Sequence, residues 1–261
     1  MKFKNKILKF YKKIIFQFKN KINLDKQELQ ITSLNDLFNH FGTDKGTEVK
    51  NQYQKILTNL DQKLIGHGYA QFYEKYLNVF KNDKINILEI GTWKGASVAA
   101  FYHYFKNAII FCIDKNFKFQ FESNRVNFFN CDTENITDIK NLEKYFIEKK
   151  TESFEVIIDD GSHNYTDILN NFQNFFKRIK PGGFYIIEDF NHYRLHSSYF
   201  NDKPDNAFDI SEIFEFLLNK KNFKSEDLDH DFQNYCFENI SNITIHKGIK
   251  DYSYIAFIKK K

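Results

Sequence analysis

The sequence LEIGTWKG at residues 88–95 decides the fold of this chain. The apolar run Ile85–Ile90 predicts a buried strand, and the two glycines after it predict a tight turn that leads into a helix near residues 95–106. The spacing is G-x-x-x-G, which differs from the G-x-G-x-x-G pattern of dinucleotide-binding turns. The stretch therefore predicts the first strand, turn and helix of an α/β domain.

Short apolar runs alternate with amphipathic stretches from here to the C-terminus, which is typical of a parallel sheet covered by helices. Besides Ile85–Ile90, the predicted strands are Ala108–Ile113, Val126–Asn130, Phe154–Asp159 and Phe184–Glu188, with helices near 95–106, 136–149 and 165–179. Two further β-rich runs, Ile240–His246 and Tyr252–Lys259, predict an antiparallel hairpin. The predicted fold is a Rossmann-like, doubly wound sheet of seven strands, mostly parallel, with a C-terminal antiparallel hairpin and N-terminal helices.

The chain divides into three parts. Residues 1–30 form a basic amphipathic arm, residues 31–82 a helical N-terminal segment, and residues 83–261 the core, with a helical insertion near 200–235. The arm holds nine lysines against Asp25 and Glu28, a net charge of +7, whereas the whole chain carries +4. The rest of the chain is therefore net acidic, which disfavours nucleic acid as a partner.

In the arm, Phe3, Ile7, Phe10, Ile14 and Phe18 recur at spacings of three and four residues, which places them on one stripe of a helix. Two interpretations stay open. The arm attaches peripherally to an anionic membrane or a partner, or it packs on its own or a sister subunit or stays disordered; the second interpretation is favoured. If the arm packs on a sister subunit, the protein is a homo-oligomer.

Composition excludes several classes of protein. Of 261 residues, 42% are hydrophobic and 28% charged, which indicates a folded globular protein. Three widely spaced cysteines suggest neither a disulfide framework nor a zinc site, so a reducing cytoplasm is expected. No apolar run is long enough to span a bilayer, and lysines interrupt the N-terminal segment where a signal peptide needs an apolar centre.

In an open α/β sheet, ligands bind at the carboxyl ends of the strands near the switch in strand order. Here those ends are acidic. Glu89 precedes Gly91, Asp114 ends the second strand, and Asp132 follows the third. An acid before the glycine turn would repel a pyrophosphate, but it can bind amino or hydroxyl groups of a nucleoside. Asp114 is placed to bind a ribose diol and Asp132 an adenine edge.

The next two strands bring four carboxylates to the same edge. The run IIDDGSH at residues 157–163 supplies Asp159 and Asp160, and the run YIIED at 185–189 supplies Glu188 and Asp189. Asp160, Glu188 and Asp189 would repel one another without a cation, and an all-oxygen set suits Mg²⁺, Ca²⁺ or Mn²⁺. Alternatively, these acids are solvated strand ends, with Asp160 or Ser162 capping the next helix.

His163 lies three residues after Asp160 in the turn before that helix. Beside a cation that holds an alcohol, it is placed to act as a general base. His192, just after Glu188 and Asp189, is the competing base or a spare ligand.

These residues together resemble class I S-adenosylmethionine-dependent methyltransferases. The EIGTWKG block, Asp114, Asp132 and the PGG turn before the fifth strand carry this resemblance. IDDGSH, IED and FGTDKG at residues 41–46 are more specific, because they resemble metal-dependent sugar O-methyltransferases of the macrolide and rhamnosyl type and the related cephalosporin hydroxylase-like proteins. The resemblance covers about residues 40–190.

The resemblance implies roles for individual residues. Asp160, Glu188 and Asp189 match the Mg²⁺ ligands, and His163 matches the catalytic base. His67 is a further candidate for lining the cofactor pocket, although helix and turn packing explains it and Tyr69 equally well. The positions implied to bind S-adenosylmethionine are Thr43, Asp44, Lys45, Tyr69, Glu89, Gly91, Thr92, Lys94, Asp114, Asp132 and Asp159.

The expected activity is methyl transfer to a hydroxyl of a sugar or small glycan precursor, in a bacterial surface polysaccharide such as a capsule or in a secondary metabolite. A phosphorylated or phosphoramidate-bearing group is an alternative acceptor. A nicotinamide-dependent oxidoreductase and a non-catalytic binding protein are alternative functions. Glu89 and the acid cluster disfavour the first of these, and the intact set of Asp160, His163, Glu188 and Asp189 disfavours the second.

Overall fold

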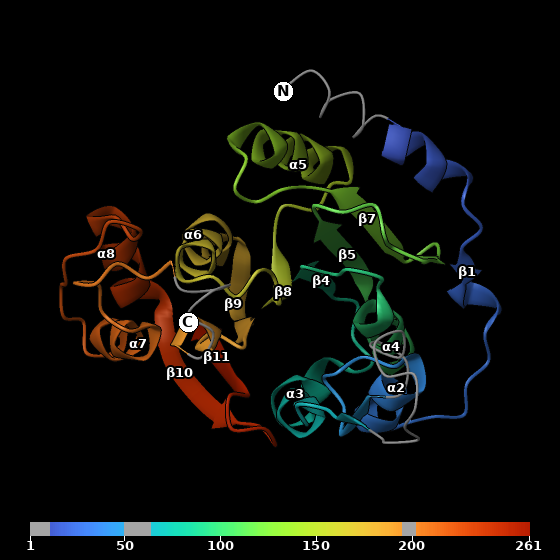
Figure 1. The fold of residues 1–261 in the computed structure, drawn as a ribbon, viewed down its shortest axis with the longest axis horizontal. Coiled ribbons are helices and arrows are strands. Elements are labelled where there is room, and N and C mark those ends of the chain that lie inside the picture. The colour runs from blue at the N-terminus through green and yellow to red at the C-terminus, as the bar shows by residue number, and fades with distance from the viewer. Residues whose placement is uncertain (1–10, 50–63, 195–201) are drawn as a thin grey trace.

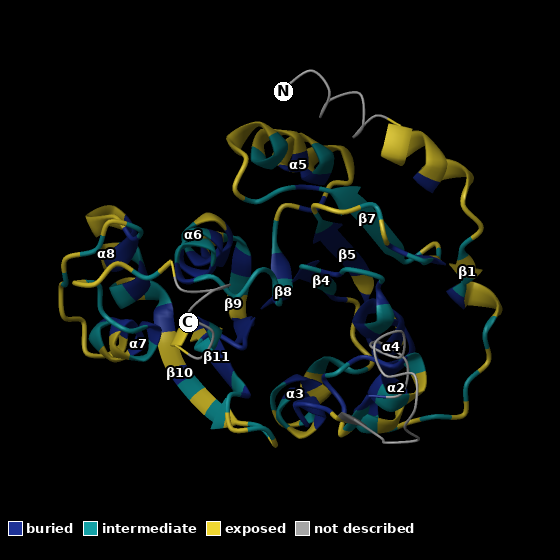
Figure 2. Ribbon diagram, viewed as in Figure 1, coloured by how far each residue is buried: buried dark blue, intermediate teal, exposed yellow. Residues whose placement is uncertain are grey.

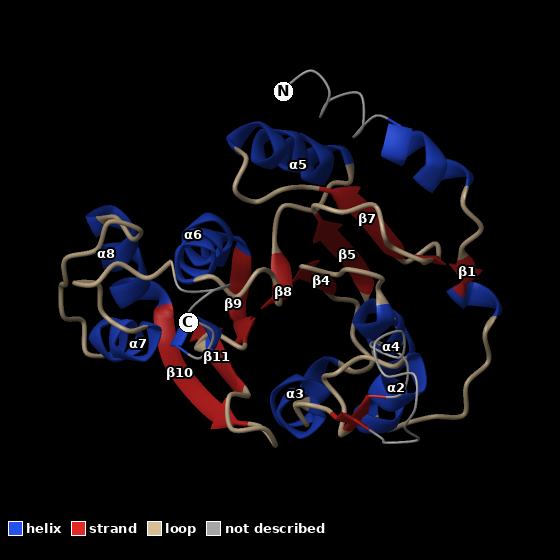
Figure 3. Cartoon of the chain, viewed as in Figure 1, coloured by secondary structure: helices blue, strands red, loops and turns tan. Residues whose placement is uncertain are grey.

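The computed structural model describes residues 11–49, 64–194 and 202–261. Its centre is a sheet of seven strands in the order β10-β11-β9-β8-β4-β5-β7 (Figures 1 and 3). The strands are β4 (Asn86–Ile90), β5 (Ile109–Asp114), β7 (Val126–Asn130), β8 (Phe154–Asp159), β9 (Ile179–Glu188), β10 (Ile240–Lys247) and β11 (Tyr254–Lys260). The predicted fold class is confirmed.

The first five of these strands in the chain pair with one another in parallel, and β11 runs antiparallel to both of its neighbours. β4 pairs with β5 on one side and β8 on the other, so the strand order reverses beside β4. β5 then pairs with β7, and β8 with β9. β11 is antiparallel to β9 and to β10, which makes the predicted C-terminal hairpin. The reversal beside β4 is where this class of sheet binds ligands.

Helices cover both faces of the sheet, as parallel strands require (Figures 1 and 2). One face is covered by α2 (Leu34–Phe41), α3 (Ala70–Leu77) and α4 (Ala96–Tyr104). The other is covered by α5 (Ile136–Glu148), α6 (Tyr165–Phe175), α7 (Ile210–Leu218) and α8 (His230–Asn239). Along β4, Ile87 packs on the first face and Leu88 and Ile90 on the second, because successive side chains alternate.

The sequence prediction misplaced the start of the fifth strand. α6 ends at Phe175, and the 3₁₀ turn η3 (Phe176–Arg178) leads directly into β9, so the expected helix 165–179 is too long. Lys180 to Gly183, predicted as a turn before the strand, lie within β9 as a bulge: pairing with β8 shifts from Phe154 with Ile179 to Val156 with Phe184. Gly182 has φ +80°, and a Cβ on Gly183 would lie 2.4 Å from the carbonyl oxygen of Glu155.

The segment predicted to be helical, residues 31–82, is only partly so. α2 and α3 are separated by the short antiparallel strands β2 (Glu48–Val49) and β3 (Leu64–Ile65), and α3 is followed by the 3₁₀ turn η2 (Asn78–Phe80). Residues 50–63 lie outside the described part. In the predicted insertion near 200–235, the structure places α7 and the first part of α8.

The N-terminal arm packs through a residue outside the predicted stripe. Residues 11–18 are helical, and Phe16 is buried against Phe117 and Phe128, with ring centroids 5.5 and 5.2 Å apart. Ile14 and Phe18 of the predicted stripe are exposed instead. Phe3, Ile7 and Phe10 lie outside the described residues.

After the arm, the chain is held by strand β1 (Ile22–Asn23), which pairs with β6 (Phe121–Glu122), and by the 3₁₀ turn η1 (Leu24–Lys26). All three cysteines are free. Among the described residues, no helix has both the length and the apolar content needed to cross a bilayer.

Candidate functional site

The carboxyl ends of β4, β5, β7 and β8 surround a cavity of about 380 Å³. A smaller cavity of about 180 Å³ lies beside it and is lined by the loop after α2 and the start of α4. Both cavities are lined by Asp44, Gly91, Trp93 and Asp160. The reversal of strand order beside β4 therefore coincides with a divided cavity, as the topology predicts.

The turn after β4 depends on Gly91. Its φ is +86°, and a Cβ at this position would lie 2.0 Å from the carbonyl oxygen of Asp160. Glycine thus lets the turn pass directly against the end of β8. Trp93, also at positive φ, donates its backbone N–H to Asp114 Oδ2 at 2.8 Å, so the acid that ends β5 fixes the same turn.

Seven of the residues predicted to bind the cofactor line these cavities. The larger cavity is lined by Asp114 and Asp132, the smaller by Thr43, Thr92 and Lys94, and both by Asp44 and Gly91. The prediction also missed lining residues, among them Trp93, Asn116, Ser162 and Asn171. No charge or glycine marks these four, so only their sequence proximity to the strand ends could have indicated them.

The other four predicted cofactor residues line neither cavity: Lys45, Tyr69, Glu89 and Asp159. Asp159 faces the opposite side of β8, where its carboxylate accepts hydrogen bonds from Asn171 Nδ2, Tyr185 and the Gly161 backbone at 3.2 to 3.3 Å. Burial raises the pKa of Asp159 to about 7. This geometry supports a role in positioning the loop after β8 and gives no support to cofactor contact.

Lys45 is the centre of the acid cluster. Its side chain is 1% exposed, and Nζ donates to Asp160 Oδ2 at 2.5 Å and to Glu188 Oε2 at 2.8 Å. Burial alone would lower the pKa of Lys45, but the charges of Asp160 and Glu188 outweigh burial and raise the pKa well above its usual value. Two residues predicted as metal ligands therefore already share one positive charge.

Tyr73 of α3 and Tyr69, the residue just before α3, complete the anchoring of Glu188 at the end of β9 and of Asp189 after it. Tyr73 donates its hydroxyl to Glu188 Oε1, and Tyr69 donates to Asp189 Oδ1. The sequence prediction missed Tyr73, yet a signal was available: it lies four residues after Tyr69, so one helical turn places both hydroxyls on the same face. Both oxygens of Glu188 are therefore engaged, one by Tyr73 and one by Lys45.

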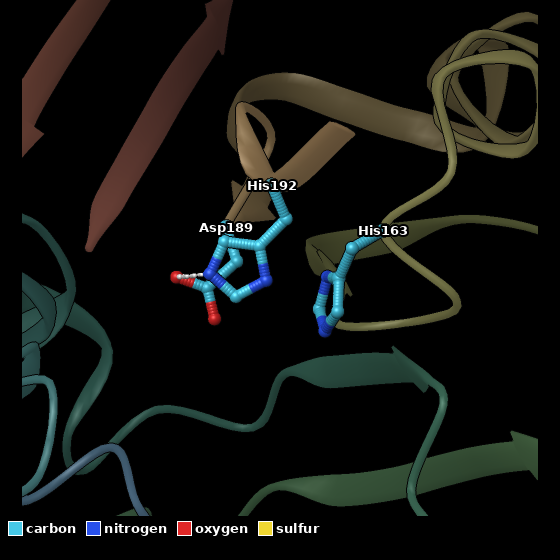
Figure 4. Close-up of side chains that lie close together, drawn as sticks. All are labelled: His163, Asp189 and His192. Atoms are coloured by element: carbon cyan, nitrogen blue, oxygen red, sulfur yellow. Dashed lines mark ion pairs between the residues drawn. The ribbon is translucent and has the colours of Figure 1, made fainter. Parts of the chain in front are cut away.

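Asp189 lies in a separate group with three histidines. Its Oδ1 is 3.3 Å from His67 Nδ1 and 3.6 Å from His192 Nε2. Burial alone would raise the pKa of Asp189, but the hydrogen bond from His67 and the charge of His67, His163 and His192 lower it below its usual value. Figure 4 shows Asp189 and His192 side by side, with the His163 ring facing them.

His163 connects the acid cluster to the cofactor cavity. It has a φ of +60°, which non-glycine residues rarely adopt, and its Nε2 lies 3.7 Å from Asp160 Oδ1. It lines the larger cavity, which His192 does not. The geometry therefore favours His163 over His192 as a group that can reach a molecule in that cavity.

The predicted metal ligands Asp160, Glu188 and Asp189 have the negative charge that a cation needs, but their oxygens do not converge on one point in this structure. Asp160 and Glu188 converge on one positive charge, that of Lys45, so the pair is built to bind a cation. Within the described residues, however, the trio whose possible ligand atoms lie within 4.8 Å of one another is His163, Asp189 and His192. A metal bound by both Asp160 and Glu188 would either displace Lys45 from one of these acids or lie beside its ammonium.

Glu89 is the least compensated acid of the cluster. It is fully buried, and apart from a contact with the Ser97 side chain its carboxylate oxygens have no hydrogen-bond partner in the described part of the chain. Burial raises the pKa of Glu89 to about 7, and the nearby charge of Lys45 and the Ser97 contact oppose this only in part. A buried carboxylate with so little compensation is costly to ionise.

Comparison with known proteins shows that part of the chain is similar to methyltransferases. Residues 88–190 match the family model described as a methyltransferase domain. Demethylmacrocin O-methyltransferase of Streptomyces fradiae is 27% identical over 130 residues, which cover 47% of this chain and 32% of that protein. Mycinamicin VI 2''-O-methyltransferase of Micromonospora griseorubida is also 27% identical over 130 residues, covering 47% and 31%. The chain thus matches about a third of the length of these relatives.

Among solved structures, the MycE methyltransferase of the mycinamycin pathway, in complex with Mg, SAH and mycinamycin VI, superposes with a TM-score of 0.62. The match has 18% sequence identity and covers 88% of this chain and 55% of MycE. The chain therefore shares the fold of the MycE methyltransferase, as its motifs predicted.

The burial of Glu89 predicts how the free energy of unfolding depends on pH. Its folded pKa of about 7 exceeds the usual 4.5, so the native state holds a proton that the unfolded chain releases, and stability falls as the pH rises between these values. Glu89→Gln removes this penalty. Relative to the parent chain, we expect it to gain about 3 kcal/mol of unfolding free energy between pH 4.5 and pH 8, measured by urea unfolding. Glu148→Gln, at an exposed site, is the control; an equal offset at both pH values for Glu89→Gln would contradict the prediction.

Proposed function

We propose that this chain, whose residues 88–190 carry a methyltransferase domain, transfers a methyl group from S-adenosylmethionine to a hydroxyl of a sugar-bearing small molecule or glycan precursor. One observation carries the proposal: a single cavity is lined by the predicted nucleoside ligands Asp114 and Asp132 and by the predicted base His163. The relatives named above, O-methyltransferases of macrolide sugars, support the substrate class. A precursor of a surface polysaccharide such as a capsule is the finer form of the proposal.

The cofactor fits the larger cavity by the chemistry of its lining. Asp114 and Asp132 offer carboxylate oxygens to ribose hydroxyls and to an adenine amino group, and Gly91 lines the same cavity. S-adenosylmethionine supplies a methyl group on a positively charged sulfur. An acidic cavity stabilises that positive charge, whereas it would repel the pyrophosphate of a nicotinamide cofactor.

His163 is the proposed general base. As the acceptor oxygen bonds to the methyl carbon, the carbon–sulfur bond breaks, its electron pair stays on sulfur, and the hydroxyl proton moves to His163 Nε2. Asp160 Oδ1, at 3.7 Å, stabilises the resulting imidazolium. Positioning the acceptor beside the base removes much of the entropic barrier.

Asp160, Glu188 and Asp189 are the proposed ligands of Mg²⁺ or another hard divalent cation. When bound, such a cation would lower the pKa of a coordinated acceptor hydroxyl. The protein itself contributes the placement of the three carboxylates: Tyr69 and Tyr73 fix the two acids of β9, and the turn at Gly91 fixes Asp160.

A cytoplasmic location remains part of the proposal. The free, buried Cys112, Cys131 and Cys236 support it, because thiols persist in reducing compartments. The oligomeric state stays a prediction.

Cofactor choice is tested by isothermal titration. We expect S-adenosylmethionine and S-adenosylhomocysteine to bind and NAD not to bind, because Asp114 and Asp132 suit a nucleoside and repel a pyrophosphate. The titrations are run with Mg²⁺ and with excess chelator, and positive cases are followed by methyl transfer to sugar nucleotides. Binding of NAD alone, or of none of these, would reject the proposed function.

The role of His163 is tested by substitution. We expect His163→Ala to lower kcat by about 10² to 10⁴-fold, the usual contribution of a general base, while the affinity for S-adenosylhomocysteine stays unchanged. His192→Ala is the matched control, since His192 lies 3.6 Å from Asp189 but does not line the cavity. If His192→Ala shows the larger loss, the base is His192.

A further inference from the structure

We propose that Lys45 is a built-in competitor of the divalent cation: its ammonium holds Asp160 and Glu188 together until a metal ion displaces it from at least one of them. The inference rests on the proposed function for the existence of a cation site, and it concerns what regulates that site. It assigns Lys45 to the metal centre, whereas the sequence motifs placed it beside the cofactor.

The contacts of Lys45 are those of a counter-ion. Nζ lies 2.5 Å from Asp160 Oδ2 and 2.8 Å from Glu188 Oε2, and it is shielded from water. When it is ionised, Glu89 adds a third negative charge near the ammonium. Glu188 ends β9, Asp160 directly follows β8 and Glu89 lies near the end of β4, and these three strands are adjacent, so the sheet itself brings the acids together. Without Lys45 or another cation, these charges would repel one another in a buried site.

A metal ion bound by Asp160 and Glu188 would compete with or repel the Lys45 ammonium, which contacts the same two carboxylates. Cation ligands lie about 2.0 to 2.6 Å from the ion, and Asp160 Oδ2 and Glu188 Oε2 are the oxygens that Lys45 holds. The remaining oxygen of Glu188 accepts the Tyr73 hydroxyl. Binding through both acids therefore breaks a Lys45 contact or places two positive centres side by side, and either event costs affinity.

The backbone at Lys45 is held independently of its side chain. The carbonyl of Lys45 accepts from the Tyr69 N–H at 2.8 Å, and the carbonyls of Asp44 and Gly46 accept from His67 and Gly68 at 2.6 and 2.9 Å. The side chain can therefore leave the carboxylates while the loop stays in place. A substitution at Lys45 consequently changes the charge in the site without removing what anchors the loop.

The test measures Mn²⁺ binding by electron paramagnetic resonance and by titration calorimetry. We expect Lys45→Met to bind Mn²⁺ at least ~10-fold more tightly than the parent chain, because a buried positive charge beside the ligands is lost. The control is Lys115→Met, which removes the same charge from a cavity residue that pairs with Glu134 at the surface. Its Mn²⁺ affinity should stay within about twofold, because exposed charges are screened.

Thermal unfolding gives a second readout without activity. In chelator, Lys45→Met should unfold at a lower temperature than the parent chain, and saturating Mn²⁺ should remove most of this difference. Equal or weaker Mn²⁺ binding by a folded Lys45→Met would overturn the inference, as would absence of Mn²⁺ binding to every variant. Failure of the proposed function is distinguishable, because it appears as absence of S-adenosylhomocysteine binding in the parent chain.

Different residues carry a second inference: we infer that the helical residues 11–18 dock on an anionic membrane surface. Tyr11, Ile14, Ile15 and Phe18 are spaced as one face of a helix, and all four are exposed, Phe18 at 83%. Phe16 projects to the opposite side and packs on Phe117 and Phe128. The helix is therefore fixed to the domain through Phe16 while Tyr11, Ile14, Ile15 and Phe18 stay exposed. Figure 2 shows that most of this segment is exposed.

Charge identifies the occupant of this face. Lys12, Lys13, Lys19 and Lys21 lie in or just after the same helical segment, with Lys21 Nζ 4.3 Å from the centroid of the Phe16 ring, and no acidic residue precedes Asp25. An apolar face bordered by lysines suits anionic lipid headgroups and the acyl chains below them. The segment that follows is tied down: Asp25 accepts from Tyr102, Ser123 and the Asn124 backbone at 2.7 to 2.9 Å, so docking would hold the whole domain at the surface.

Vesicle co-sedimentation tests this surface. We expect the full chain to pellet with phosphatidylcholine vesicles containing phosphatidylglycerol, less so at high salt, and not with phosphatidylcholine alone. Ile15→Asp with Phe18→Asp should abolish pelleting, whereas Val79→Asp, at another residue with an exposed apolar side chain, should not. A dimer in light scattering that Phe18→Asp separates, with no vesicle binding, would overturn the inference and assign the face to a second copy.

Discussion

The structure depends on how buried negative charge is balanced at the carboxyl edge of the sheet. Glu89, Asp160 and Glu188 end three adjacent strands on the same face, and the pairing of β4, β8 and β9 leaves no freedom to separate them. Lys45 brings the compensating positive charge from the loop after α2. The N-terminal segment is therefore part of the site, although it lies outside the residues that match a methyltransferase domain.

The same edge separates two chemical environments. Toward β5 and β7, Asp114 and Asp132 line a cavity with room for a ligand. Toward β9, Tyr73 binds Glu188, and Tyr69 and His67 contact Asp189. Neither Glu188 nor Asp189 lines either cavity. Gly91 stands between these regions, where its missing side chain allows the turn after β4 to touch Asp160. His163, on the loop after β8, is the group that faces both.

The C-terminal hairpin contributes to the site as well as to the sheet. The carbonyl of Tyr254 accepts the Asp189 N–H at 2.8 Å, and Ser253 lies 2.7 Å from His67 Nδ1. A Cβ on Gly248 would lie 2.3 Å from the carbonyl of His67, so the hairpin turn packs directly on the loop before α3. Elements from both ends of the chain thus fix Asp189, which explains why its surroundings were not evident from any one motif.

The sequence by itself determined the sheet, its glycine turn and the acidic strand ends, because alternating apolar runs and local turn residues are short-range properties. It placed strands β4, β5, β7 and β8 within a residue or two, but it did not predict the short strand β6. It also misplaced the start of β9, because pairing with β8 absorbs the Pro-Gly-Gly segment as a bulge. Only the tertiary structure decided the partners of the acids. Lys45 meets Asp160 across 115 residues and Glu188 across 143, and Asp159 faces away from its neighbour Asp160 because side chains alternate along a strand. Such contacts follow from the packing of distant elements, which no local pattern of residues records.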